Sequence, residues 1–397
     1  MSMLASTLPY LVAVAAYVVL AWVVGRLPAS LRTNVLAGTE KDDPAITATR
    51  GIAAVSVLCA HSFDYASNKY AQTFFASFGV CVFFIITGYL FFSMVRRDRF
   101  NMNSFFKKRI LRLVPAAYLA IATIQFLDWA QWGFPGFDTR QLNALARNFM
   151  FGFVGDMFGV TAIHDLASIV QKMGMIWTLK WEWLFYLTFP LAVAAAGKSL
   201  PKLFLVTAGL YLAFYSPQDF VRTSPANYML LFLMGATCAV IHERMKTYHA
   251  GVAAVGWLLW LAVVIAYVSV SDVEHLMGGR VDYNVLVTAP FFLLVLYSGQ
   301  GKGLLMKLAR TQGVQVLGII SYSFYLYHMT AIYYSQHAVR GSIELHTPAA
   351  DLYTYLSLVP VGMLVALIAI TSYLQVEKRF MYRAPATTPI RVEAATS

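Results

Sequence analysis

Arg50 and His61 are ionisable residues at the two ends of a segment that is otherwise almost entirely apolar. Residues with this spacing point within about 20° of each other on an α-helix, after a rise of about 16 Å. Both side chains therefore project from one face of a predicted helix, roughly half a hydrocarbon core apart. Taken singly, Arg50 could be an interfacial anchor and His61 a hydrogen-bonded interior histidine. Together they indicate a polar pathway through a helical bundle, because ionisable groups inside a membrane are usually functional.

The composition predicts the kind of element that must carry this pair. Of the 397 residues, 59% are hydrophobic and 12% are charged, whereas a soluble domain usually carries about 25% charged residues. Long apolar runs recur without the alternation of a β-barrel. We predict an all-α, polytopic integral membrane bundle of about 10–11 transmembrane helices. The predicted spans are 8–25, 47–64, 73–95, 109–128, 176–197, 203–216, 226–241, 251–270, 281–298, 314–336 and 352–375.

The segment 141–160 is apolar but contains Arg147, Asn148 and Asp156, so we interpret it as a re-entrant or interfacial piece. The topology of the longer segment 141–176 is left open.

The basic residues predict the orientation of the chain. Most of the 30 Lys and Arg residues fall in one alternating set of loops between the predicted spans. By the positive-inside rule this set is cytoplasmic, which places the N-terminus outside and the C-terminus inside. The net charge of +11 then needs no nucleic-acid partner, because it is mostly this loop bias.

Five segments occur in a fixed order and share one resemblance. The Arg50–His61 segment is followed by FGVCVFFIITGYLF (78–91), KKRILRLVPAAY (107–118), WTLKWEWLFYLTFPL (177–191) and LGIISYSFYLYH (317–328). In this order they resemble the signature of the membrane-bound acyltransferase-3 family, whose members acylate sugars and other hydroxyl-bearing molecules at membranes. FLMGA (232–236) and VEKRF (376–380) are weaker echoes.

The resemblance covers about residues 46–380 and implies an acyltransferase domain there. It would follow an N-terminal helix and cytoplasmic loop (1–45) and precede a cytoplasmic tail (381–397) that we expect to be disordered. The implied location is a bacterial cytoplasmic (inner) membrane. Two departures matter. Cys81 stands where many relatives have an acidic residue, and the chain is too short for the extracytoplasmic hydrolase-like domain of some relatives. The protein would finish its reaction alone or hand the acyl group to a separate extracytoplasmic transferase.

Arg109 and Arg112 are spaced i,i+3 and share a helix face at the cytoplasmic end of a predicted span. Forked guanidinium groups suit phosphate oxygens, and Lys108 raises the local positive potential. Because the resemblance implies a cytoplasmic acyl-CoA donor, we predict that these three residues bind it. Acetyl-CoA would be a co-substrate and not a tightly bound cofactor. Alternatively, the basic residues only set the topology.

His61 is the candidate general base, because an imidazole can take a proton from an acceptor hydroxyl and return it. Glu182 is predicted to lie in the outer half of its span, where an isolated carboxylate is costly. We therefore predict that Glu182 contacts and orients His61, as the acid does in a serine hydrolase triad. Glu182 could instead bind the acceptor or pair with Lys180. Arg50 could hold the donor or stabilise the oxyanion.

A second group of residues is predicted to serve the acceptor. His328 lies in the outer half of its predicted span, with Tyr322 and Tyr325 as sugar-facing groups. Ser321 and Tyr322 are candidates for a covalent relay, and Trp177 could stack on a sugar. An interfacial aromatic belt would explain several of these residues equally well. No spacing such as HExxH or CxxC occurs, so we predict no metal site.

These residues favour an integral membrane O-acyltransferase. It would move an acyl group, most simply acetyl, from cytoplasmic acyl-CoA to a hydroxyl of a glycan, glycolipid or lipid-linked sugar. The alternative is a proton-coupled secondary transporter or exporter, since buried Arg, His and Glu also suit that function. No two-half repeat supports a transporter. A third alternative is a non-catalytic membrane scaffold. The pattern sets neither the acceptor, the acyl length nor the oligomeric state.

Overall fold

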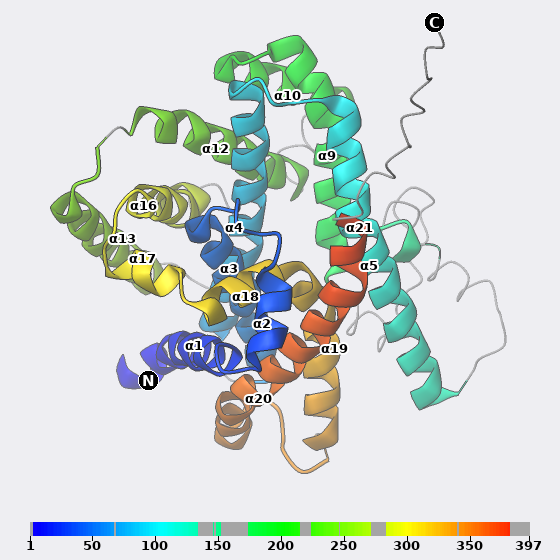
Figure 1. Ribbon diagram of the computed structural model, residues 1–397. Helices are drawn as coiled ribbons and strands as arrows, with labels where there is room; N and C mark the ends of the chain where they lie inside the picture. The colour runs from blue at the N-terminus through cyan, green and yellow to red at the C-terminus, as the bar shows by residue number, and fades with distance from the viewer. Residues whose placement is uncertain are drawn as a thin grey trace, which may run out of the picture.

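The computed structural model describes residues 3–66, 69–133, 146, 148–151, 174–214, 224–245, 247–270, 283–339 and 341–381. Within these ranges every regular element is helical (Figure 1), which confirms the predicted all-α class. Nearly all of the segment 141–160 and of the tail 381–397 lies outside the described residues. The helices are α1 (Met3–Val24), α2 (Ala29–Leu36), α3 (Pro44–Phe63), α4 (Lys69–Arg96), α5 (Met102–Trp132), α9 (Ile176–Ala196), α10 (Leu200–Phe214), α12 (Ser224–Arg244), α13 (Ala250–Val270), α16 (Ala289–Gly299), α17 (Leu304–Ala309), α18 (Gln312–Ile319), α19 (Ser321–Val339), α20 (Pro348–Ser372) and α21 (Lys378–Met381), with π-helical turns η2 (Asn284–Thr288) and η3 (Tyr373–Glu377).

Each predicted span coincides with helical structure, and the protein is a multi-pass membrane protein. In the described part of the chain, 6 helices are long and apolar enough to cross a membrane. They are Thr7–Val24, Pro44–Phe63, Lys69–Arg96, Met102–Gln131, Ala250–Ser269 and Pro348–Met381. The other predicted spans fall on helices that are shorter or carry more polar residues, such as α9 with its Lys180 and Glu182.

The predicted span 314–336 is not one helix. It is divided into α18 and α19 by a break at Ile320. The reason lies in packing, because α18 docks tightly on α3. A Cβ atom added to Gly318 would lie only 2.0 Å from the carbonyl oxygen of Thr47. Hydropathy cannot show this break, since both pieces are apolar.

Large apolar side chains are exposed along α1, α13 and α20, which lie on the outside of the bundle. In Figure 1, α13 stands at the edge of the molecule, far from the central α4. So many exposed apolar side chains suit contact with lipid tails, because the hydrocarbon core of a membrane contains no water from which they would need to be buried. The residues include Leu11, Val14, Val18 and Trp22 on α1, Val252, Val255, Leu258, Leu259 and Ile265 on α13, and Leu352, Leu356 and Leu364 on α20.

The centre of the bundle is α4, which packs between α3 and α12. Gly88 of α4 and Gly235 of α12 bring the two backbones together. Added Cβ atoms would lie 2.0 Å from the Phe232 carbonyl oxygen and 2.1 Å from the Ile85 carbonyl oxygen respectively. Small residues that permit such close approach are typical of membrane helix interfaces. The α4–α12 pair therefore forms a rigid support for the helices that carry polar residues.

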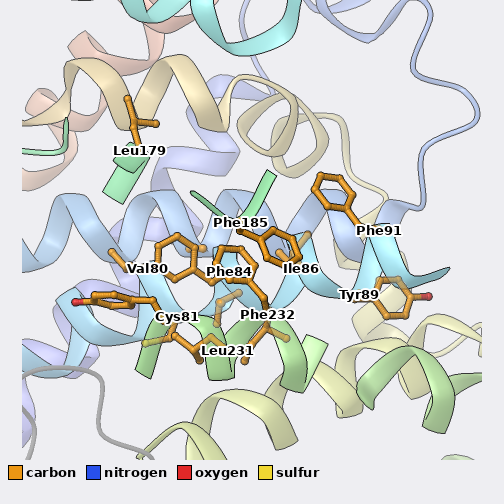
Figure 2. Packing of buried hydrophobic residues seen from close by; sticks show 14 of the residues in the cluster. Val80, Cys81, Phe84, Ile86, Tyr89, Phe91, Leu179, Phe185, Leu231 and Phe232 are labelled. Atoms are coloured by element: carbon orange, nitrogen blue, oxygen red, sulfur yellow. The ribbon is translucent and has the colours of Figure 1, made fainter. Parts of the chain in front are cut away.

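Aromatic stacking attaches α9 to this support. The rings of Phe185 on α9 and Phe232 on α12 are stacked with centroids 3.9 Å apart, and Phe84 of α4 lies 4.9 Å from Phe232. Figure 2 shows these side chains gathered between the helices. Such a contact fixes both the depth and the rotation of α9, and so determines where Glu182 points.

Candidate active site

A cavity of about 90 Å³ lies between α3, α4, α5, α9 and α19. We call it the arginine cavity, because Arg50, Arg109 and Arg112 line it together with Glu182 and Tyr186. The remaining lining is Val80, Phe83, Phe84, Ile86, Thr87, Leu90, Phe91, Leu113, Thr178, Leu179, Ser321, Tyr322 and Tyr325. The predicted donor pair and Arg50 therefore meet in one place although they come from two helices.

Helix α5 positions the arginine pair. It begins after Asn101, whose side chain accepts a hydrogen bond from the backbone N–H of Ser104 at 2.9 Å. The i,i+3 spacing then turns Arg109 and Arg112 to the same side. The Arg109 guanidinium lies 5.0 Å from the centre of the Phe91 ring, and its buried Nε has no hydrogen-bond partner among the described residues. Lys108, predicted to bind the donor with them, is exposed and does not line the cavity.

The charges in the arginine cavity do not balance. Glu182 accepts a hydrogen bond from the Tyr186 hydroxyl and interacts electrostatically with all three arginines. No ion pair within 4.0 Å joins Glu182 to any of them in the described part of the chain. Three guanidinium groups but one carboxylate line the cavity, and Asp42 and Glu377, which lie outside the lining, offset part of this excess by acting electrostatically on Arg50 and Arg112. Such an excess is costly unless an anion compensates it.

A second, larger cavity of about 270 Å³ lies beside His61. We call it the histidine cavity. Its lining comes from the end of α3, from the second half of α19 and from the loop before α20, and consists of His61, Asp64, Tyr65, Met329, Ile332, Tyr333, Gln336, His337, Leu345 and His346. Three hydrogen bonds hold the loop: from the Tyr65 hydroxyl to the Ile343 carbonyl at 2.9 Å, between His346 Nδ1 and the Ala66 carbonyl at 2.8 Å, and from the His346 backbone N–H to the Tyr65 carbonyl at 3.2 Å.

The two cavities follow one another along the interface of α3 and α19. Arg50 and the first turns of α19 line the arginine cavity, whereas His61 and later turns of α19 line the histidine cavity. The two helices therefore run in the same direction. Since Arg50 and His61 lie on one helix about 16 Å apart, the predicted polar pathway corresponds to two cavities in series.

Tyr325 and His328 lie between the two cavities. The His328 side chain is 0% exposed, and its ring lies 5.2 Å from the His61 ring and 5.3 Å from the Tyr325 ring. The Tyr325 hydroxyl lies 2.9 Å from Thr178 Oγ1, across the top of the arginine cavity. These contacts form a layer of polar side chains between His61 in one cavity and Thr178 in the other.

The predicted contact between His61 and Glu182 is wrong. Glu182 lines the arginine cavity, accepts a hydrogen bond from Tyr186 and interacts electrostatically with the arginines, whereas His61 lines the other cavity and lies beside His328. The physical reason is the depth of α9, whose first turn is already buried at Ile176 and Thr178. A helix that starts inside the bundle carries its seventh residue deeper than a count from a presumed membrane surface suggests.

The predicted acceptor residues are divided by the structure. Ser321, Tyr322 and Tyr325 line the arginine cavity, where the Tyr322 hydroxyl donates to the Leu113 carbonyl at 3.0 Å. Trp177 is 43% exposed, lies 5.4 Å from the Tyr228 ring and lines neither cavity. His328 reaches neither cavity surface.

Several lining residues were not predicted. Tyr186 follows Glu182 by one helical turn in the quoted tryptophan-rich segment, so its position could have been inferred from the i,i+4 spacing. Gln336, His337 and His346 could not, because a loop and a helix end come together only in the folded chain. Among the described residues, no group of three or more His, Cys, Asp or Glu side chains could hold a metal ion.

Comparisons with known proteins agree with this architecture. Residues 43–373 match the acyltransferase-3 family model, described as an acyltransferase domain. Nodulation protein 10 of Rhizobium leguminosarum bv. viciae is 26% identical over 281 residues, covering 65% of this chain and 72% of that protein. Acyltransferase MdmB of Streptomyces mycarofaciens is 24% identical over 333 residues, covering 76% and 81%.

An uncharacterized protein of Haemophilus influenzae is 29% identical over 139 residues, which is 33% of this chain and 56% of that protein. No solved structure matches the chain. The family model spans most of the chain and includes every helix that lines the two cavities. The chain therefore belongs to the acyltransferase-3 family.

Proposed function

We propose that this protein is an integral membrane O-acyltransferase that transfers an acetyl group from cytoplasmic acetyl-CoA to a hydroxyl of a glycan or lipid-linked sugar. The observation that carries the proposal is the excess of guanidinium groups in the arginine cavity, directly below a histidine-lined cavity on the same two helices. The name of the relative MdmB, an acyltransferase, supports the reaction class.

The donor would bind at the arginine cavity. Arg109 and Arg112 would hold phosphate oxygens of coenzyme A with forked hydrogen bonds. The flexible pantetheine arm would then extend between α3 and α19 toward His61. Because the cavity holds only about 90 Å³, donor binding requires lining side chains such as Tyr325 to move.

The acceptor would bind in the histidine cavity, where His61 acts as general base. His61 removes the proton from the acceptor hydroxyl, the oxygen attacks the thioester carbonyl, and the proton passes to the departing thiolate. Arg50, on the donor side, is the candidate group for stabilising the oxyanion. Ser321 lines the arginine cavity and is the candidate for a covalent relay.

The chain would lie in a bacterial cytoplasmic membrane with its N-terminus outside, so that the arginine cavity opens toward cytoplasmic acetyl-CoA. The acetyl group would pass directly to the acceptor or to a separate extracytoplasmic transferase.

The test is transfer by purified protein in detergent. Radiolabelled acetyl-CoA is supplied with membrane vesicles from cells that lack the chain, and both CoA release and label in glycan or lipid are measured. We expect transfer with wild type and a loss on the order of 10²-fold or more with His61→Ala. Uptake of label into sealed proteoliposomes without CoA release would instead identify a transporter. No CoA release from a well-folded sample would exclude the proposed enzyme.

A further inference from the structure

His328 is a buried titratable residue to which the proposed reaction gives no role. Its ring has no exposed surface and lies 5.2 Å from that of His61, at a tilt of 39°. Its Nδ1 lies 2.6 Å from the carbonyl oxygen of Tyr325. Because a carbonyl can only accept, Nδ1 carries the proton of neutral His328. Its Nε2 is therefore an acceptor.

This acceptor is unused in the structure. Among the described residues, His328 Nε2 is a buried atom without a hydrogen-bond partner. Buried polar atoms are nearly always paired, so an exception needs an explanation. The nearby polar group is the His61 imidazole. At a ring-centroid separation of 5.2 Å, two ring nitrogens that point toward each other lie roughly 3 Å apart, which is hydrogen-bond distance.

His61 has a matching requirement. A histidine that acts as general base must present an unprotonated nitrogen to the acceptor hydroxyl while its other nitrogen donates its N–H to a fixed partner. Glu182 cannot be that partner, since it faces the arginines. We propose that His328 Nε2 accepts the N–H of His61, so that His328 is the positioning residue that sets the tautomer of the general base. This inference rests on the proposed function.

Asp64 is the rival partner. It follows His61 by one turn at the end of α3 and lines the same cavity. Asp64 also interacts electrostatically with His61. However, its carboxylate is exposed, so water competes for it, and its Oδ1 already accepts a hydrogen bond from Gln72 Nε2 at 2.8 Å. His328 is buried, has a lone pair without a partner, and has its tautomer set by the Tyr325 carbonyl. The geometry therefore favours His328 over Asp64.

The proton balance of the reaction is unchanged by this arrangement. One proton moves from the acceptor oxygen to His61, the new C–O bond forms as the C–S bond breaks, and the thiolate sulfur recovers the proton. His328 keeps its own Nδ1 proton throughout. Its acceptor nitrogen strengthens its hydrogen bond to His61 when that ring becomes an imidazolium.

The experiment compares three substitutions at position 328 in the transfer assay described above. His328→Phe keeps a ring but has no acceptor, and we expect kcat to fall on the order of 10²-fold, with an unchanged KM for acetyl-CoA. His328→Gln supplies an acceptor oxygen near the position of Nε2. Its kcat should therefore be at least about tenfold higher than that of His328→Phe. His328→Ala should resemble His328→Phe. His249→Phe, at an exposed site outside both cavities, is the matched control and should retain activity.

A double-variant cycle completes the test. If His328 acts through His61, then His61→Ala/His328→Phe should be no slower than His61→Ala alone. Equal losses in the Phe and Gln variants, or a loss in Asp64→Asn as large as in His328→Phe, would overturn the inference. So would full activity of His328→Phe. Should a variant show a lowered thermal midpoint, its kcat is compared at a temperature where both proteins are folded.

These outcomes are distinct from failure of the proposed function. That failure would appear as wild-type protein without CoA release, or as His61→Ala with full activity. A histidine whose only role is structural would lower the yield or thermal midpoint of all three variants alike, without rescue of kcat by Gln.

Discussion

At the scale of single residues, the arginine cavity is defined by three guanidinium groups, none of which forms an ion pair within 4.0 Å with Glu182, the carboxylate in its described lining. Close ion pairs are found elsewhere in the described chain, between Arg96 and Glu243 at 2.7 Å and between Lys198 and Asp98 at 2.6 Å. Both of those pairs are partly exposed, where such contacts contribute little to stability. In contrast, Arg109 is half-buried, and its buried Nε has no hydrogen-bond partner among the described residues. The proposed binding of an anionic donor would compensate these charges.

Removal of an arginine should therefore impair donor binding more than chemistry. A hydrogen bond to a charged group contributes about 1.5–3 kcal/mol, so Arg109→Ala or Arg112→Ala should raise the KM for acetyl-CoA about 10-fold or more. Higher salt should weaken binding further, because phosphate contacts at the cavity mouth are screened. Isothermal titration with CoA at two salt concentrations checks this. Lys108→Ala is the control, and an equal effect there would show that only general positive potential matters.

Glu182 should affect stability and donor binding differently from His61. Glu182→Gln keeps an oxygen for Tyr186 but removes the single carboxylate facing three guanidiniums. The arginines then repel one another, and we expect a thermal midpoint lower by several degrees in the absence of ligand. CoA, which is an anion, should restore more stability to Glu182→Gln than to wild type. Thermal unfolding in detergent with and without CoA measures both effects. An unchanged midpoint would show that Glu182 does not balance the arginines.

At the scale of helices, the site depends on close approaches between backbones. The α4–α12 crossing at Gly88 and Gly235 fixes the support on which α9 stacks through Phe185 and Phe232. The contact of Gly318 with Thr47 fixes α18 against α3, and the chain starts a separate helix, α19, at Ser321. This break lets Ser321 and the tyrosines of α19 face the arginine cavity.

The α4–α12 crossing predicts a sharp difference between two glycines. In Gly88→Ala, the new Cβ would lie 2.0 Å from the Phe232 carbonyl oxygen, so the helices must separate. We expect a loss of about 3 kcal/mol, seen as a lower thermal midpoint and lower activity. Gly209→Ala on α10 is the control, because nothing lies within 4 Å of its added Cβ. Alanine should be neutral or slightly stabilising there. Similar midpoints for the two variants would contradict the predicted close contact.

At the scale of the whole molecule, the helices place two unlike cavities one above the other. The arginine cavity is cationic and suits a phosphorylated donor. The histidine cavity is lined by histidines and other polar groups that suit a hydroxyl compound. Since α3 and α19 line both cavities, the proposed donor and acceptor would meet at one shared interface. This arrangement suits transfer of a group across the membrane without transport of either whole molecule.

The orientation that this requires can be tested with single cysteines. Cys59, Cys81 and Cys238 are free and buried, so a membrane-impermeant maleimide should not label them. Lys41→Cys lies in a predicted cytoplasmic loop and Ser342→Cys in a predicted outer loop, and both positions are exposed. In intact cells we expect labelling of Ser342→Cys only, and of both variants after permeabilisation. The reverse pattern in intact cells would invert the proposed topology.

The sequence by itself determined the features that depend on the geometry of one helix. Hydrophobic runs located the spans, the common face of Arg50 and His61 followed from their spacing, and so did that of Arg109 and Arg112. These predictions needed only the period of the α-helix.

Only the tertiary structure decided how far each helix lies along its neighbours. The depth of α9 assigned Glu182 to the arginines and left His328 as the ring beside His61, and the loop before α20 brought His346 to the same cavity. The physical reason is that helix depth and rotation are set by contacts between residues far apart in the chain, such as Phe185 with Phe232 and Gly318 with Thr47. The sequence pattern within a single helix does not reveal these long-range contacts.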